Sequence, residues 1–180
     1  MKYIYTILIL MITFVVGIFL FQQSVHTGAN SQRIDCHKTY TVFERIYNDT
    51  LLENVKDALY AGEYELNSSV KKAKFMPTRL FNYVHLSDVD QLVKDAISVY
   101  KKATPKTDDK VNIDYYIYEN DKADPGKKTQ KSKLYAGYLR FTFTYQGINV
   151  YAVQVDFMDT QGRDIDKSVQ CAIESVVTAS

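Results

Sequence analysis

The stretch Tyr138–Phe157, YLRFTFTYQGINVYAVQVDF, decides the fold predicted for most of this chain. On both sides of Gln146-Gly147, apolar or aromatic residues alternate with polar or small ones, which is typical of strands in a sheet. Two such runs separated by two residues that include a glycine predict a β-hairpin. We therefore expect strands over 134–145 and 148–157 that pair with each other.

Upstream of this hairpin, the spacing of apolar residues predicts four further elements. A period of two predicts strands over 63–70 and 111–118. Apolar residues at helical spacing predict helices over 50–61 and 88–102, the second with Lys101 and Lys102 in its last turn. The exported part of the chain is therefore expected to mix helices with a sheet.

The first of these helices carries signals at both ends. Thr50 and Glu53 match a capping box, in which the threonine hydroxyl and the glutamate satisfy free backbone amides. Gly62 is a natural residue for a left-handed C-cap. Two other segments fit two structures: 39–47 fits a strand or a helix, and 164–177 fits a helix slightly better than a strand.

The apolar stretch Tyr3–Phe21, YIYTILILMITFVVGIFLF, holds no charged residue and no proline. As a helix it covers about 28 Å, close to the hydrocarbon thickness of a bilayer. Lys2 precedes the stretch and the next Lys or Arg is Arg33, so we expect an uncleaved anchor with a cytoplasmic N-terminus. A signal peptide cleaved after Thr27-Gly28-Ala29 is the competing interpretation.

The sequence thus predicts three regions and an α+β fold class. Residues 1–22 form a short cytoplasmic start and a transmembrane helix, 23–35 a stalk, and 36–180 one compact domain with an antiparallel sheet and two or three helices. Cys36 and Cys171 lie near the two ends of this domain, and we expect them to form a disulfide in an oxidising compartment. Two unrelated buried thiols are the alternative.

Charge and motifs argue against several classes of function. Lys and Arg number 22 and Asp and Glu 21, so the net charge of +1 provides no field for direct binding of nucleic acid. The chain contains no HExxH or CxxC motif and no paired histidines. Because no nucleophile, base and orienting group come together, we expect a protein that is not an enzyme and that uses no metal or cofactor.

The candidates for partner contact are a lysine-rich loop, 120–133, and the tyrosines of the neighbouring strands. The loop contains an Asp-Pro-Gly turn and is expected to be exposed. Tyrosine offers a large and rigid contact area. A solvated loop and the outer side of a sheet are the competing interpretations. The predicted contact residues are Lys127, Lys128, Lys131, Lys133, Tyr116, Tyr118 and Tyr138.

Two other groups of side chains have simpler interpretations. Lys71, Lys72 and Lys74 follow the strand 63–70 and are interpreted as solvated residues that blunt a sheet edge. The histidines His37 and His85 are candidates for sensing acid, because histidine changes its charge between about pH 5 and 8.

The span Tyr3–Phe21, the pair Cys36 and Cys171, and the strands YLRFTFTY and INVYAVQVDF together resemble the FidL-like inner-membrane proteins, which are similar to ToxS-type accessory proteins. The resemblance implies a single-pass protein of the bacterial inner membrane with its C-terminal domain in the periplasm. Such proteins accompany membrane-anchored winged-helix transcription regulators, bind the exported domain of the regulator, stabilise it and contribute to sensing. The family brings no catalytic residues.

Three functions of different classes follow. The first is a non-enzymatic accessory subunit that binds and stabilises a membrane-anchored transcription regulator. The second is a structural subunit of an envelope machine, such as a secretion system or a flagellar motor. The third is a periplasmic binder of a hydrophobic small ligand, held in an apolar cavity lined by the tyrosine and phenylalanine strands.

Overall fold

The computed structural model describes residues 30–103, 109–127 and 129–180. Residues Ser31–Ser180 form a compact unit of their own. The predicted transmembrane helix lies outside the described residues. Within the described part of the chain, no helix combines the length and the apolar character needed to cross a membrane.

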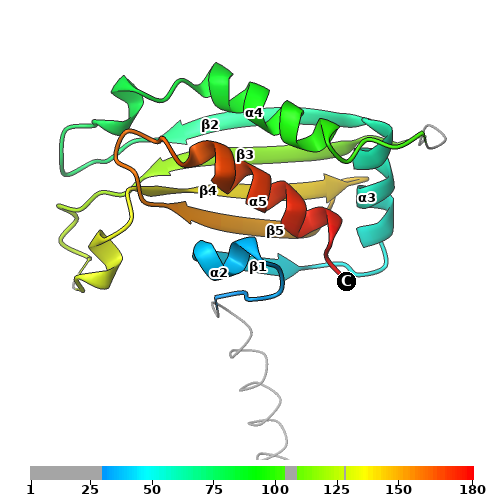
Figure 1. Ribbon diagram of the computed structural model, residues 1–180, viewed down its shortest axis with the longest axis horizontal. Helices are drawn as coiled ribbons and strands as arrows, with labels where there is room; N and C mark the ends of the chain where they lie inside the picture. The colour runs from blue at the N-terminus through cyan, green and yellow to red at the C-terminus, as the bar shows by residue number, and fades with distance from the viewer. Residues whose placement is uncertain (1–29, 104–108, 128) are drawn as a thin grey trace, which may run out of the picture. The chain divides into compact units, whose positions relative to one another are not determined.

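Five strands form one mixed sheet in the order β1-β5-β4-β3-β2 (Figure 1). They are β1 Val42–Ile46, β2 Tyr64–Lys71, β3 Val111–Glu119, β4 Gly137–Tyr145 and β5 Ile148–Phe157. All neighbours pair antiparallel except β2 and β3, which pair parallel. The prediction of an antiparallel sheet is therefore wrong for β2. Parallel neighbours require a long crossover connection, and the segment between β2 and β3 contains the helix that provides it.

The hairpin predicted from the sequence is confirmed, but its first strand begins at Gly137 rather than at residue 134. Strands β4 and β5 pair with Arg140 opposite Gln154 and Thr142 opposite Ala152. Gln146 and Gly147 have φ angles of 50° and 76°. Positive φ at both central residues is the geometry whose twist matches that of the flanking strands, so this two-residue turn sets the register of the pair.

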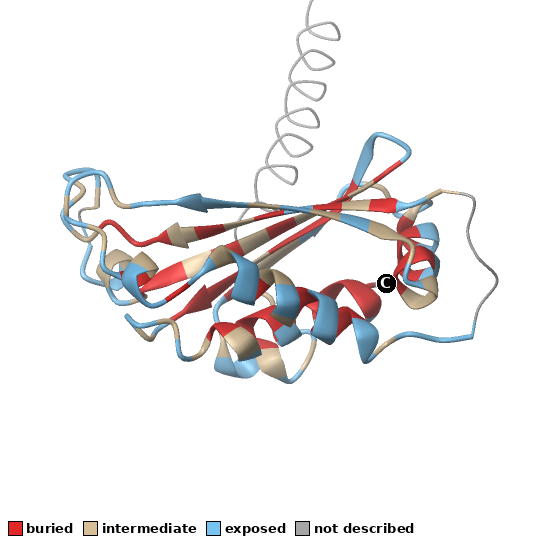
Figure 2. Ribbon diagram, turned by 90° about the horizontal axis from the view of Figure 1, so that it is seen from above, coloured by how far each residue is buried: buried red, intermediate tan, exposed pale blue. Residues whose placement is uncertain are grey.

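Helices cover one face of the sheet. Figures 1 and 2 show α4 and α5 lying across this face with their buried sides toward the strands. The helix α3 packs against β3, β4 and β5. The α-helices are α2 Cys36–Thr39, α3 Leu52–Ala61, α4 Leu86–Ser98 and α5 Ile165–Val177, and the 3-10 turns are η1 Leu80–Asn82 and η2 Lys131–Lys133.

The core lies between the helices and the sheet. Alternate residues of β4, Leu139, Phe141 and Phe143, are fully buried, while their neighbours on the other face are only partly buried. The rings of Phe141 and Tyr115 stack with centroids 5.0 Å apart. Burying side chains of this size stabilises the fold by roughly 1.5–3 kcal/mol each.

The disulfide between Cys36 and Cys171 is confirmed, with a Cα–Cα distance of 5.7 Å. It joins α2 to α5. The two ambiguous segments are also resolved: residues of 39–47 form β1, because they pair with β5, and 164–177 contains the helix α5. Residues 31–35, which the sequence places at the end of the stalk, belong to the compact unit.

The predicted ends of two helices need correction. Thr50 does not cap α3: its hydroxyl contacts the Asp49 carboxylate, and the Asn48 side chain accepts from the Leu51 amide instead. The left-handed C-cap at Gly62 is confirmed by its φ of 77°.

Helix α4 begins at Leu86 and ends at Ser98, four residues before the predicted end at 102. The Lys102 amide donates to the Tyr60 carbonyl rather than continuing the helix. Lys101 and Lys102 therefore lie beyond the last turn, and the Lys102 ammonium packs 3.6 Å from the Tyr60 ring centroid.

Candidate functional site

The parallel pairing of β2 and β3 brings two lysine-rich segments to the same end of the sheet. Lys71, at the end of β2, lies opposite Tyr118 of β3. The segments that follow, 72–79 and 120–136, therefore leave the sheet side by side (Figure 1). The sequence alone gives no sign that these two segments are neighbours. We call their cationic residues the basic end: Lys71, Lys72, Lys74, Arg79, Lys122, Lys127, Lys131 and Lys133.

The predicted tyrosines lie beside the basic end, on the face of the sheet opposite the helices. Tyr138 contacts Tyr118 and Tyr116, with ring centroids 4.6 and 5.9 Å away. The Lys71 ammonium lies 3.4 Å from the Tyr116 centroid, and the Lys127 ammonium lies 5.2 Å from that of Tyr118. The structure thus brings together four of the predicted contact residues and adds Lys71 to them.

Of the other three predicted lysines, the structure describes two. Lys131 and Lys133 lie in the short turn η2 of the same connection. Lys128 lies outside the described residues.

Among the tyrosines, burial raises the pKa of Tyr138, and the neighbouring Tyr116 and Tyr118 raise it further. The Tyr138 hydroxyl is therefore a neutral donor at physiological pH.

Behind the basic end lies a buried carboxylate, Glu119, which is 2 % exposed. It accepts hydrogen bonds from the Thr78 hydroxyl at 2.5 Å and from the amides of Arg79 and Leu80 at 2.7 and 3.0 Å. Burial raises the pKa of Glu119, but these hydrogen bonds outweigh it and hold the pKa below its usual value. The ionised carboxylate thus fixes the segment after β2 against the end of β3.

A second acid repeats this arrangement two residues later. Asp121 accepts hydrogen bonds from the amides of Lys74 and Phe75, both at 2.6 Å. The side chain of Asn120 donates to two carbonyls of the 120–136 connection. The prediction that loop 120–133 is exposed is therefore wrong for Asn120 and Asp121, which are buried because they hold two loops together.

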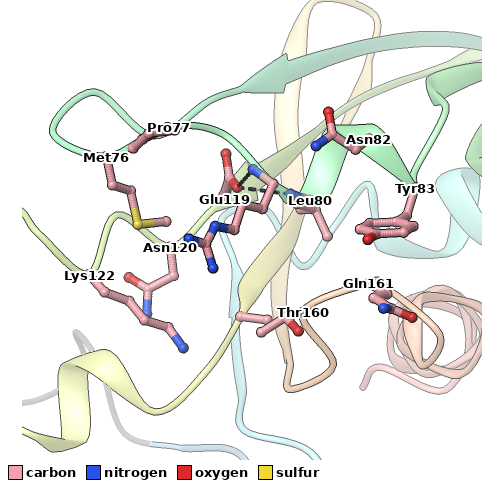
Figure 3. A pocket seen from close by; sticks show the side chains of 12 residues that line it. Met76, Pro77, Leu80, Asn82, Tyr83, Glu119, Asn120, Lys122, Thr160 and Gln161 are labelled. Atoms are coloured by element: carbon pink, nitrogen blue, oxygen red, sulfur yellow. Dashed lines mark hydrogen bonds between the residues drawn. The ribbon is translucent and has the colours of Figure 1, made fainter.

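A cleft of about 560 Å³ opens at the basic end, between three segments that are distant in sequence. The first segment follows β2, the second joins β3 to β4, and the third is the turn after β5. Figure 3 shows Met76 and Lys122 on one side of the cleft and Tyr83 with Gln161 on the other. Its lining consists of Met76, Pro77, Arg79, Leu80, Asn82, Tyr83, Glu119, Asn120, Lys122, Ala136, Thr160 and Gln161.

Most polar side chains of this lining have no internal partner. Within the described ranges, the structure contains no hydrogen bond or ion pair made by the side chains of Arg79, Lys122, Asn82, Thr160 or Gln161. The Tyr83 ring is 58 % exposed. Glu119 and Asn120 differ, because their polar atoms are committed to the loops. The cleft therefore offers polar groups that are available to a ligand.

The predicted acid sensor His37 lies elsewhere, in a buried polar cluster next to the disulfide. The side chain is 1 % exposed. Its Nδ1 lies 2.9 Å from the Ser31 hydroxyl and its Nε2 lies 2.8 Å from the Ser175 hydroxyl. Burial lowers the pKa of His37, Glu44 raises it and Arg33 lowers it, with a net shift downward. The second predicted acid sensor, His85, is exposed and precedes the first residue of α4.

Glu44 organises the rest of this cluster. It accepts hydrogen bonds from Arg33 at 2.9 and 3.0 Å, from Ser31 at 2.6 Å and from the Tyr151 hydroxyl. Burial raises the pKa of Glu44, but these donors lower it to about 2. Arg33 also donates to the carbonyls of Ser175 and Thr178, at the end of α5. The cluster therefore binds the first residues of the compact unit to its last helix.

One group of side chains has the composition of a metal site. The ligand atoms of Cys36, His37 and Cys171 lie within 4.8 Å of one another. Both sulfurs are joined in the disulfide, however, and a thiolate rather than a disulfide is the sulfur ligand that metals take. The group is therefore better explained as a structural disulfide beside a buried histidine.

Sequence reasoning missed the cleft. Arg79, Asn82, Tyr83, Thr160 and Gln161 stand in segments without periodicity, and only their tertiary placement joins them. One signal was present: Glu119 continues the buried alternation of Val111, Ile113, Tyr115 and Ile117. An acid in a buried strand position needs hydrogen-bond donors, and that requirement points to a loop folded over it.

No protein-family model, curated protein or solved structure matches this chain. The likeness to FidL-like proteins therefore stays a prediction.

Proposed function

We propose that this chain is a non-enzymatic, single-pass protein of the bacterial inner membrane whose periplasmic domain binds and stabilises a partner anchored in the same membrane, a membrane-anchored transcription regulator. The observation that supports this proposal best is the surface formed by the basic end and by Tyr116, Tyr118 and Tyr138. Lysines from two distant segments share this surface with the Tyr138 ring and the two rings that it contacts, Tyr116 and Tyr118.

The chemistry of this surface suits a protein partner with an acidic patch. The tyrosines offer rigid contact area at low cost in side-chain entropy. The surrounding lysines attract an acidic surface and speed its association, an effect that salt screens. Both oxygens of Glu119 accept hydrogen bonds from the segment after β2, whereas only one oxygen of Asp121 does, and its other oxygen has no hydrogen-bond partner within the described residues. These two buried acids are outnumbered by the cations of the basic end.

The proposal of a non-enzymatic role is supported by the placement of the serine and histidine pair. Ser175 contacts the His37 ring, as a nucleophile contacts its base. Both residues are buried, however, and Ser175 is 0 % exposed. A substrate has no access to this hydroxyl, which also lies 2.7 Å from the Cys171 carbonyl. The pair is better explained as part of the core.

The proposed location is supported by the disulfide. Bonds of this kind persist in oxidising compartments and are rare in the bacterial cytosol. Cys36 and Cys171 join the two ends of the compact unit. Together with the apolar stretch 3–21, this bond fits a domain that is exported and tethered.

The test is co-purification of the full chain from solubilised bacterial membranes. We expect a single-span protein with a DNA-binding domain to be recovered with it. The triple variant Lys71→Gln, Lys72→Gln, Lys127→Gln should reduce that recovery about tenfold, because each lysine near an acidic surface contributes to association. The matched control Lys94→Gln, Lys101→Gln, Lys167→Gln removes the same charge from exposed residues elsewhere and should leave recovery unchanged.

Two results would contradict the proposal. One is recovery of a secretion or motor assembly in place of a regulator, which would favour a structural subunit. The other is equal recovery by both triple variants, which would exclude the basic end as the contact surface.

A further inference from the structure

We propose that the cleft at the basic end binds a small organic anion, one negatively charged group on a flat apolar body, with Arg79 and Lys122 contacting the charged group. This inference goes beyond the proposed function, because it assigns a ligand to a site that partner binding does not require. It is carried by the charge of the lining, by its rigid walls and by its exposed aromatic ring.

The charge of the lining favours an anion. Arg79 and Lys122 contribute two positive charges, and neither makes an ion pair within the described ranges. Glu119 contributes one negative charge. Both of its oxygens accept hydrogen bonds from Thr78, Arg79 and Leu80. The arginine and lysine side chains are therefore the groups left to meet a ligand, and hydrogen bonds between such cations and an anion are among the strongest in proteins.

The first wall of the cleft is held in place without a ligand. The segment after β2 would otherwise be a loop of free backbone amides. Glu119 and Asp121 accept hydrogen bonds from the amides of this segment, at residues 73–75 and 79–80. A wall already ordered in the free protein does not lose further conformational entropy on binding, which favours affinity.

The opposite wall, the turn after β5, is fixed in the same way. The Asp164 carboxylate accepts from the amides of Met158 and Asp159, and Asp159 accepts from that of Gln161. Gly162 has a φ of 74°, and a Cβ at this position would collide with Val84. The turn therefore packs directly against the segment that carries Tyr83, and it presents Thr160 and Gln161 toward the cleft.

The remaining lining suits an apolar body with few polar atoms. Tyr83 offers an exposed ring, and Met76, Pro77, Leu80 and Ala136 add apolar surface. Figure 3 shows Tyr83 and Leu80 on the same side of the cleft as Asn82. A volume of about 560 Å³ lies in the range usual for small-molecule sites. A flat ring system stacked on Tyr83 would thus leave its charged group to Arg79 and Lys122.

The experiment uses the full chain in nanodiscs of zwitterionic lipid, with empty nanodiscs as the blank. Three probes of one shape are titrated by ligand-observed NMR: naphthoate, neutral naphthamide and cationic naphthylmethylamine. We expect saturable binding of naphthoate, and binding of the other two weaker by about tenfold or more, as expected for loss of a charge-assisted contact. Two further probes, a phosphate monoester of naphthol and inorganic phosphate, test whether binding requires the aromatic body or only the charged group.

Variants place the binding in the cleft. Arg79→Gln and Lys122→Gln should each weaken naphthoate binding about tenfold, and Tyr83→Ala should weaken it while leaving binding of inorganic phosphate unchanged. Lys94→Gln, an exposed lysine on α4, is the matched control and should bind as the natural protein does. A circular dichroism spectrum confirms that each variant folds.

Equal binding of the three probes, or binding that survives Arg79→Gln and Lys122→Gln, would overturn the inference. So would an absence of saturable binding by any anion. Because these measurements contain no partner protein, they fail or succeed independently of the co-purification.

Discussion

Two clusters of this domain contain similar polar side chains, but those of the first are hydrogen-bonded within the protein and those of the second are not. In the first, around His37, Glu44 and Arg33, the side chains donate to and accept from one another and from backbone carbonyls. In the second, the cleft, Arg79 and Lys122 have no such partners within the described part of the chain. The first cluster joins the ends of the compact unit, whereas the second opens to solvent.

This difference in hydrogen bonding implies that the first cluster contributes to stability and that the second is available for binding. A buried polar group repays its loss of hydration only when its hydrogen bonds are satisfied, so the cluster around Glu44 is expected to be costly to disturb. An exposed polar group without a partner contributes little to stability and is free to meet a ligand. The comparison therefore predicts that substitutions in the two clusters affect different measurements.

The largest expected effect is loss of the disulfide beside the His37 cluster. The double variant Cys36→Ala, Cys171→Ala should lower the free energy of unfolding by about 4–5 kcal/mol, because the bond closes a very long loop in the unfolded chain. Urea unfolding of both proteins, with and without reductant, measures this. Reductant should destabilise only the natural protein, and equal stability of the two proteins without reductant would contradict the prediction.

The next effect is a pH dependence due to Glu44. Its pKa is lowered from 4.5 to about 2, so its stabilising contribution is present above pH 4.5 and is lost as the pH falls toward 2. The loss amounts to about 3 kcal/mol, since one pKa unit corresponds to about 1.4 kcal/mol. Urea unfolding between pH 2 and 5 should show this slope in the natural protein and a shallower one in Glu44→Gln. Identical slopes would show that other carboxylates carry it.

Glu119 belongs to the cleft but is buried and hydrogen-bonded, so its substitution is expected to affect stability as a substitution in the His37 cluster does. Glu119→Ala leaves the amides of Arg79 and Leu80 without their acceptor. Unsatisfied buried donors cost about 1–3 kcal/mol. We expect a loss of stability in this range and faster hydrogen exchange at these two amides, measured by mass spectrometry. Unchanged exchange would mean that another group holds the segment.

His37 is expected to add a smaller dependence at higher pH. Its pKa is lowered by burial, so its contribution to stability is present above pH 6.5 and is lost as the pH falls below that value. Unfolding measured from pH 7.5 to 5 should show less loss of stability in His37→Gln than in the natural protein. His85→Gln is the control, because this residue is exposed and should not alter the slope.

The smallest expected effect is on stability at the cleft itself. Arg79→Gln and Lys122→Gln should change the free energy of unfolding by less than about 0.5 kcal/mol, as is usual for surface side chains without partners. The same variants are expected to weaken anion binding. A large loss of stability in either variant would show that the cleft resembles the His37 cluster and would end the contrast between them.

Elements built from local pattern were predictable, and contacts between distant segments were not. The alternation of Leu139, Phe141 and Phe143 and the turn at Gln146-Gly147 were enough to predict the hairpin, because its pairing partners are close in sequence. The parallel pairing of β2 with β3 depends instead on a crossover through α4. Lys71 and Tyr118 become neighbours only through that pairing, so the basic end could not be predicted from either segment alone.

The sequence by itself predicted the hairpin and most of the other strands and helices, the pairing of Cys36 with Cys171, and the tyrosine and lysine residues available for contact, but it left the segments 39–47 and 164–177 ambiguous. Only the tertiary structure decided which of these residues share a surface, that Glu119 and Asp121 order a loop some 40 residues away, and that a cleft forms there. The physical reason is that periodicity and turn chemistry act over a few residues. The hydrogen bonds of a buried carboxylate, in contrast, are set by whichever backbone amides the folded chain brings to it.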